Sequence, residues 1–194
     1  MSAATAPFLR RCLAWLLDAL ALSLLATAAT WRWTAAAAPA TLAAMQALRA
    51  LATTKLVDGL LAGTAPFALV QALLHDPAML QAAARLQDAL LALLLPWTLA
   101  WALLAFGWHV AGDLSPWHGS PGKHLLGLHV ASADGDALSP RQALLREAAS
   151  ALSWLTLNLG HALALLPPRR QSLHDRIART RVKKGARVIY RLKR

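Results

Sequence analysis

The chain has 194 residues, of which 57% are hydrophobic and only 15% are charged, and its mean hydropathy is +0.44. Soluble domains are about 45–50% apolar and about 25% charged. The composition therefore excludes an ordinary soluble domain and indicates an integral membrane protein. The single cysteine, Cys12, excludes an intramolecular disulfide and a cysteine-rich metal site.

The net charge of +11 is concentrated at one end of the chain. Eleven of the 20 Lys and Arg residues lie in 167–194, where Asp175 is the only acid. Such a block suits an anionic membrane face or a nucleic acid. We expect the membrane face and no nucleic-acid partner, because aromatic side chains are not interleaved with the charges.

The first apolar segment, 12–31, is long enough to cross a hydrocarbon core of about 30 Å. Arg10 and Arg11 precede it, which favours a cytoplasmic N-terminus, and Trp31 and Trp33 are expected at the far interface. The segment 34–88 is predicted to form amphipathic helices in an extracytoplasmic insert. The alternative is that 56–74 crosses the membrane.

The predicted insert is interrupted twice, by Gly63-Thr64-Ala65-Pro66 and by His75-Asp76-Pro77. The clearest span follows at 89–111, which carries no formal charge over 23 residues and contains Pro96. Its tryptophans are expected to be lipid-facing or interfacial anchors: Trp97, Trp101 and Trp108.

The segment 112–142 is predicted to be a cytoplasmic connector with a strand and a turn at Asp134-Gly135. In the tail, 167–194, the run "TRVKKGARVIY" indicates a second short strand, turn and strand. A third full span at 143–166 would place this basic tail outside, against the charge bias. We therefore expect 143–166 to be a re-entrant or interfacial segment, bent near Asn158-Leu159-Gly160.

These segments predict one all-α membrane domain over 1–194, with both termini cytoplasmic. Two full transmembrane helices pack with the bent third segment and the amphipathic insert. A small basic cap with short β-hairpins joins 124–139 to 179–190.

Asp18 is a carboxylate inside an apolar run, where a charge costs several kcal/mol. Arg11 lies on the same stripe of the helix but roughly 10 Å away along its axis, which is too far for a simple pair. Asp18 therefore needs another partner, for which a cation from elsewhere in the fold, polar backbone and a transported ion all remain open. Asp175, among arginines, is expected to be salt-bridged.

Other candidate sites give no catalytic pattern. The run "GSPGKH" lacks the first glycine and the Ser or Thr of a phosphate loop, so we interpret Pro121-Gly122 as a turn that leads Lys123 to the membrane surface. The neighbouring histidines have no metal-ligand spacing and are expected to be interfacial: His109, His118, His124 and His129. We expect no enzyme activity, no cofactor and no metal site.

Three stretches, taken in order, resemble the RDD family of bacterial membrane proteins, which is named for one arginine and two aspartates. "RCLAWLLD" matches the first-helix signature with Arg11 and Asp18. The run 120–147 is similar to the loop after the second span, and "RRQSLHDRIARTRV" matches the C-terminal signature with Asp175. The resemblance covers about 8–31 and 89–182.

The insert 34–88 is longer and more helical than the usual connection in this family. The resemblance implies the architecture first, and then transport of unidentified ligands, with some members similar to sodium/proton antiporters. It gives Arg11, Asp18 and Asp175 as the polar core, and we expect four supporting residues: Lys123, Arg146, Arg170 and His174.

The leading hypothesis is transport of an unidentified ion or small solute, such as cation/proton exchange, at a bacterial inner membrane. Asp18 would respond to the ion, while Arg11 and Asp175 hold the cytoplasmic mouth. Two spans hardly enclose a path, so a homo-oligomer or a membrane-protein partner is expected. The alternative is a non-transporting scaffold or assembly factor that binds partner proteins or anionic lipid head groups.

Overall fold

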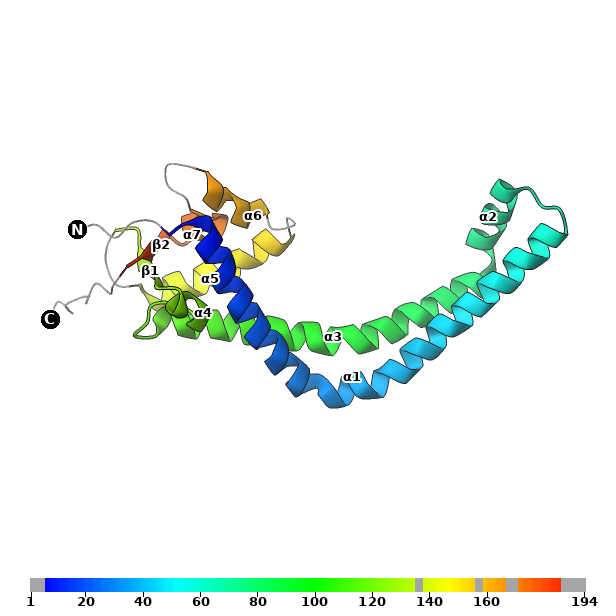
Figure 1. Ribbon diagram of the computed structural model, residues 1–194, viewed down its shortest axis with the longest axis horizontal. Coiled ribbons are helices and arrows are strands. Elements are labelled where there is room, and N and C mark those ends of the chain that lie inside the picture. The colour runs from blue at the N-terminus through cyan, green and yellow to red at the C-terminus, as the bar shows by residue number, and fades with distance from the viewer. Residues whose placement is uncertain (1–5, 135–137, 156–158, 167–170, 186–194) are drawn as a thin grey trace. The chain divides into compact units, whose positions relative to one another are not determined.

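The computed structural model describes residues 6–134, 138–155, 159–166 and 171–185. The chain divides into two compact units (Figure 1). Unit 1 comprises Met1–Leu24 and Ala102–Arg194, and unit 2 comprises Leu25–Trp101. Tail positions outside the described ranges include Arg170 and the second strand predicted near Tyr190.

Two helices are long and apolar enough to cross a membrane: α1, Phe8–Leu61, and α3, Pro77–Leu114. The helix α1 has 54 residues and passes through Pro39, so the predicted first span continues into the predicted insert without a break. The alanine-rich run that follows Trp33 has the highest helix propensity, which outweighs the one backbone donor missing at Pro39. The helix α3 likewise passes through position 89 and through Pro96.

Both predicted interruptions of the insert are confirmed. After α1 ends, Gly63 adopts a φ of 72°, and α2 begins at Pro66 and ends at His75. Asp76 then caps α3, because its Oδ1 accepts hydrogen bonds from the backbone N–H groups of Ala78 and Met79. The alternative that 56–74 crosses the membrane is wrong, since α2 has only ten residues.

The β structure of unit 1 is a single antiparallel pair among the described residues. The strand β1, Leu128–Ser132, pairs with β2, Thr180–Lys184, with Val130 opposite Val182. This pairing confirms the predicted junction between 124–139 and 179–190, whereas the predicted local hairpins extend into residues outside the described ranges. The turn expected at Asp134-Gly135 includes a residue outside the described ranges.

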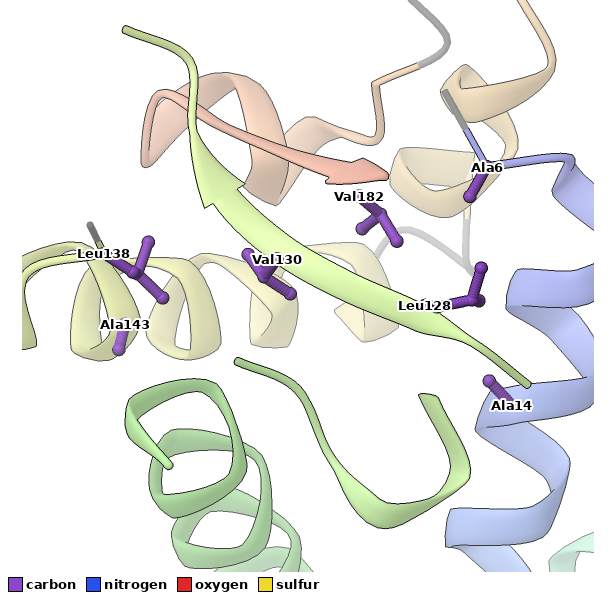
Figure 2. Close-up of a cluster of buried hydrophobic side chains, with 7 residues drawn as sticks. All are labelled: Ala6, Ala14, Leu128, Val130, Leu138, Ala143 and Val182. Carbon is purple, nitrogen blue, oxygen red and sulfur yellow. The ribbon is translucent and has the colours of Figure 1, made fainter. Parts of the chain in front are cut away.

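The core of unit 1 gathers around this sheet (Figure 2). Leu128 and Val130 from β1 and Val182 from β2 pack with Ala14 of α1 and with Ala143 of α5. The small alanine side chains let the helices approach the strands closely. Ala6, just before α1, is tied to the sheet by its backbone N–H, which donates to the carbonyl oxygen of Val182.

The third apolar segment is broken into short helices. They are α5, Pro140–Leu155; α6, Leu159–Ala162; and the 3₁₀ turn η1, Leu163–Leu165. The bend predicted near Asn158-Leu159-Gly160 falls largely on residues outside the described ranges, between the end of α5 and the start of α6. None of these pieces is long enough to cross a membrane. Two further short helices complete unit 1: α4, Pro121–Leu125, and α7, Leu173–Ile177.

Contacts within unit 2 show which positions of α1 and α3 lie at the same level. Trp97 Nε1 donates to Thr27 Oγ1, and Thr41 Oγ1 donates to the carbonyl oxygen of Ala89. Thr41 lies ten residues after Trp31, or about 15 Å along the helix. The two predicted outer ends, Trp31 and Ala89, therefore cannot both mark one membrane surface. Trp31 lies four residues after Thr27, and Thr27 is level with Trp97. If Trp31 lies at the membrane surface, α3 therefore enters the hydrocarbon near residue 93.

This register predicts which thiols react with a water-soluble maleimide in nanodiscs. In a Cys12→Ser background, Leu91→Cys should react as fast as Leu42→Cys, because both positions are about half exposed and lie beyond the level of Trp31. Leu103→Cys should stay unreacted although Leu103 is 75% exposed on the protein, because lipid covers it. An unreactive Leu91→Cys would place the interface at Thr41 instead.

Candidate functional site

The Asp18 carboxylate is buried in unit 1, and neutral groups bind it. Its Oδ1 accepts hydrogen bonds from Trp108 Nε1 (2.9 Å) and from the backbone N–H of Gly122 (2.8 Å). Its Oδ2 accepts from Ser120 Oγ. Of the predicted partner classes, the structure shows polar backbone, together with two neutral side chains. Among the described residues, no cation lies within ion-pair distance of Asp18.

Glycine at position 122 makes this contact possible. A Cβ atom there would lie 2.2 Å from the carbonyl oxygen of Ala14 and 2.9 Å from Cγ of Asp18. Because the first of these neighbours is helix backbone, a side chain would push α4 away from α1. The turn expected at Pro121-Gly122 therefore brings a backbone N–H against the carboxylate, and α4 begins there.

Asp175, at the other side of the site, binds two arginines. Its Oδ2 accepts from Arg11 Nη1 (3.0 Å), and its Oδ1 accepts from Arg146 Nε (3.2 Å). The carboxylate also receives the backbone N–H of Ser172, so it caps α7. Burial opposes the charged form, but Arg146 and the neighbouring cations hold the pKa of Asp175 well below its usual range.

Arg146 joins this acid to a third one. Its Nη1 donates to Asp113 Oδ2, while Lys123 Nζ donates to Asp113 Oδ1 (3.1 Å). Burial would lower the pKa of Arg146, but the charges of Asp113 and Asp175 raise it above its ordinary value. Burial lowers the pKa of Lys123. The ion pairs form a continuous chain, which we call the charge chain: Arg11–Asp175–Arg146–Asp113–Lys123.

The charge chain brings together most of the residues expected from the sequence. Arg11, Asp175, Lys123 and Arg146 are members. His174 is adjacent, with its Nε2 3.7 Å from Asp175 Oδ1. Arg170 lies outside the described residues. Asp18 belongs to the same unit but is not a member.

Sequence reasoning missed Asp113, which is 2% exposed at the end of α3. The signal was an acid directly after an uncharged span and ten residues before Lys123. Lys123 itself was expected at the membrane surface and is instead largely buried against Asp113.

Two other expectations need correction. Trp108 was expected to be a lipid-facing or interfacial anchor; it is half-buried, and its indole N–H binds Asp18. His129 was expected at the interface, but it is 6% exposed within β1. In both cases a polar partner or a strand position at the centre of unit 1 outweighs the amphipathic character of the side chain.

A pair of histidines borders the charge chain. The rings of His161 and His174 are 5.0 Å apart, and His174 Nε2 is 2.8 Å from Ser172 Oγ. Burial lowers the pKa of His174 to about 3, so this side chain is neutral at physiological pH. In the described part of the chain, no three His, Cys, Asp or Glu side chains lie close enough together to hold a metal ion.

Two long apolar helices joined at one end by buried ion pairs define an α-helical membrane protein. The sequence profile of the RDD family matches residues 5–179, and the chain therefore belongs to the RDD family. Comparison with curated proteins and with solved structures gives no match.

The first prediction for the site concerns Arg146. Arg146→Ala should lower the free energy of unfolding in detergent by about 3–5 kcal/mol, because it leaves two buried carboxylates short of a partner. Arg141→Ala is the matched control, since Arg141 is exposed on the same helix, and should change it by less than about 0.5 kcal/mol. Equal effects of the two variants would show that the charge chain does not stabilise the fold.

Burial of neutral His174 makes the stability of the fold depend on pH. Unfolded His174 binds a proton below about pH 6.5, whereas the folded side chain does so only near pH 3. Stability should therefore fall as the pH drops through this window, by roughly 2 kcal/mol from His174 alone at pH 5. Thermal unfolding of His174→Gln should depend less on pH between 7 and 5 than that of the wild type. Asp175 does not mask this result, because its contribution is lost only below about pH 4. Identical pH profiles would contradict the prediction.

Proposed function

We propose that this RDD-family protein moves a proton or a small cation across the membrane and that Asp18 is the group that binds it. One observation carries the proposal. Among the three buried acids of unit 1, Asp18 alone makes no ion pair with the described residues.

The contrast between the three acids separates two roles. Asp113 binds Lys123 and Arg146, and Asp175 binds Arg11 and Arg146. Fixed positive charges keep those two carboxylates permanently occupied, so they hold the structure together. Asp18 receives only dipoles, from Trp108, Ser120 and Gly122. No fixed cation among them competes with a mobile one, and an acid within an apolar helix is the usual coupling group of a transporter.

The donors around Asp18 suggest how its occupancy is communicated. Trp108 comes from α3, while Ser120 and Gly122 flank the start of α4, whose Lys123 binds Asp113. Loading Asp18 with a proton or a cation weakens the hydrogen bonds that its oxygens accept. The consequence is a looser contact between α1 and α4, one residue away from the charge chain.

We further propose that both termini face the cytoplasm of a bacterial inner membrane, because Arg10 and Arg11 precede the predicted span 12–31 and the exposed cations of β2 lie in the same unit. Two spanning helices hardly enclose a permeation path, so the transporting species is an oligomer. The path would then be lined by α1 and α3 of more than one copy.

Flux in proteoliposomes tests this function. Purified protein should dissipate an imposed sodium or proton gradient, measured with an internal pH dye, and Asp18→Asn should reduce the rate at least about tenfold, because an amide carries no exchangeable negative charge. Asp88→Asn is the matched control, since Asp88 is exposed on α3 and makes no ion pair with the described residues. The thermal unfolding of each variant in detergent checks that it is folded.

Two results overturn the proposal: absence of flux in the wild type, and unchanged flux in folded Asp18→Asn. Either one favours the alternative of a non-transporting scaffold. In that case Asp18 serves only to fasten α4 to α1.

A further inference from the structure

The end of α7 and the strand β2 carry a cluster of exposed cations. Arg176, Arg179, Arg181 and Lys184 are all exposed, and Lys183 is half-buried. None of them makes an ion pair with the described residues. We call this cluster the basic face.

Within 171–185 no exposed acid offsets the basic face. Across the sheet, the exposed Asp134 follows Ala133, whose backbone N–H donates to the carbonyl oxygen of Arg179, so one exposed acid lies near the five cations. Asp175 is the only acid in 171–185; it is fully buried, and Arg11 and Arg146 occupy its two oxygens. Along β2, Thr180 and Val182 are buried while Arg181 and Lys184 are exposed. Thr180 and Val182 contact the charge chain, through the Thr180 hydroxyl to Asp175 and the Val182 carbonyl oxygen to Arg11, and the exposed side chains of the strand are both cations.

Backbone contacts place β2 beside the start of the first helix. The carbonyl oxygen of Val182 accepts hydrogen bonds from the backbone N–H of Ala6 (3.1 Å) and from Arg11 Nη2 (3.4 Å). Arg11 directly precedes the predicted span 12–31. Because α1 rises only 1.5 Å per residue, β2 lies within a turn or two of the hydrocarbon boundary, at the depth of lipid head groups.

From this placement we propose that the basic face binds the phosphate groups of anionic phospholipids. Arg and Lys near a membrane surface are attracted to anionic lipid over distances of about 8–10 Å at physiological salt. The exposed side chain of Ile177, between these cations, adds an apolar contact of the kind found at interfaces. Lipid bound to Arg181 and Lys184 supports the strand whose Val182 carbonyl oxygen contacts Arg11.

A nucleic acid fits this surface less well. Binding to single strands uses aromatic side chains on which bases stack, and the described segment 171–185 contains no Phe, Tyr or Trp. A strand at head-group depth also leaves little room for a duplex. The same cations therefore point to lipid.

Native mass spectrometry of the full-length, delipidated protein in neutral detergent tests the proposal. The protein is titrated with phosphatidylglycerol and, separately, with phosphatidylcholine, and the bound lipids are counted. The wild type should retain phosphatidylglycerol preferentially, and the preference should weaken as salt is raised. Arg181→Gln/Lys184→Gln should weaken phosphatidylglycerol binding about tenfold and leave phosphatidylcholine binding unchanged.

The matched control is Arg49→Gln/Arg85→Gln, which also removes two exposed cations that have no ion pair with the described residues, but from unit 2. It should stay within about twofold of the wild type, and both double variants should unfold at the wild-type temperature. An equal loss in the control, or no loss in Arg181→Gln/Lys184→Gln, overturns the proposal. Binding of a single-stranded oligonucleotide that depends on Arg181 and Lys184, with no preference for phosphatidylglycerol, overturns it in favour of nucleic acid.

Discussion

The guanidinium of Arg146 is the interaction on which unit 1 depends. Breaking a buried ion pair on one side costs about 3–5 kcal/mol, so each buried charge must keep its partner. Arg146 binds Asp113 at the end of α3 and Asp175 in α7 at the same time. Each acid has a second cation: Lys123 binds Asp113, and Arg11 binds Asp175. The hydrophobic core around the sheet belongs to the same unit. One planar cation thereby fixes segments that are separated by more than sixty positions in the chain.

The buried carboxylate of Asp18 is stabilised by neutral hydrogen-bond donors instead of by cations. A carboxylate that accepts three hydrogen bonds from neutral groups keeps much of the stabilisation that water would provide, without a fixed countercharge. The arrangement depends on Gly122, because only a residue without Cβ lets the backbone N–H come this close to α1. This geometry is required whether Asp18 serves in transport or only holds α4 against α1. The two roles differ in whether the carboxylate binds and releases a proton or cation.

The predictable part of the structure was local in sequence. Hydropathy located both helices that are long and apolar enough to span a membrane, and the Gly and Pro residues located both interruptions of the insert. Alternation located β1, and the basic run "TRVKKGARVIY" indicated β2. Helical spacing correctly indicated that Arg11 and Asp18 do not pair directly. The partners themselves were harder, because Trp108, Asp113 and Ser120 meet their ligands only through tertiary folding. The continuity of α1 through Pro39 was also missed, since neighbouring alanines outweigh a single unfavourable residue.

The pairing of Arg11 with Asp175 sets an order of assembly during synthesis. The two residues are 164 positions apart, so at about 5–20 residues per second Arg11 waits roughly 8–30 seconds for its acid. Within that interval α1 and α3 are completed, whereas β1 has no strand to pair with. The end of unit 1 that holds the ion pairs therefore stays incomplete until Asp175 has been synthesised. A chain that stops before Asp175 leaves Arg11 and the Nε donor of Arg146 without their acid, so unit 1 cannot complete its buried ion pairs.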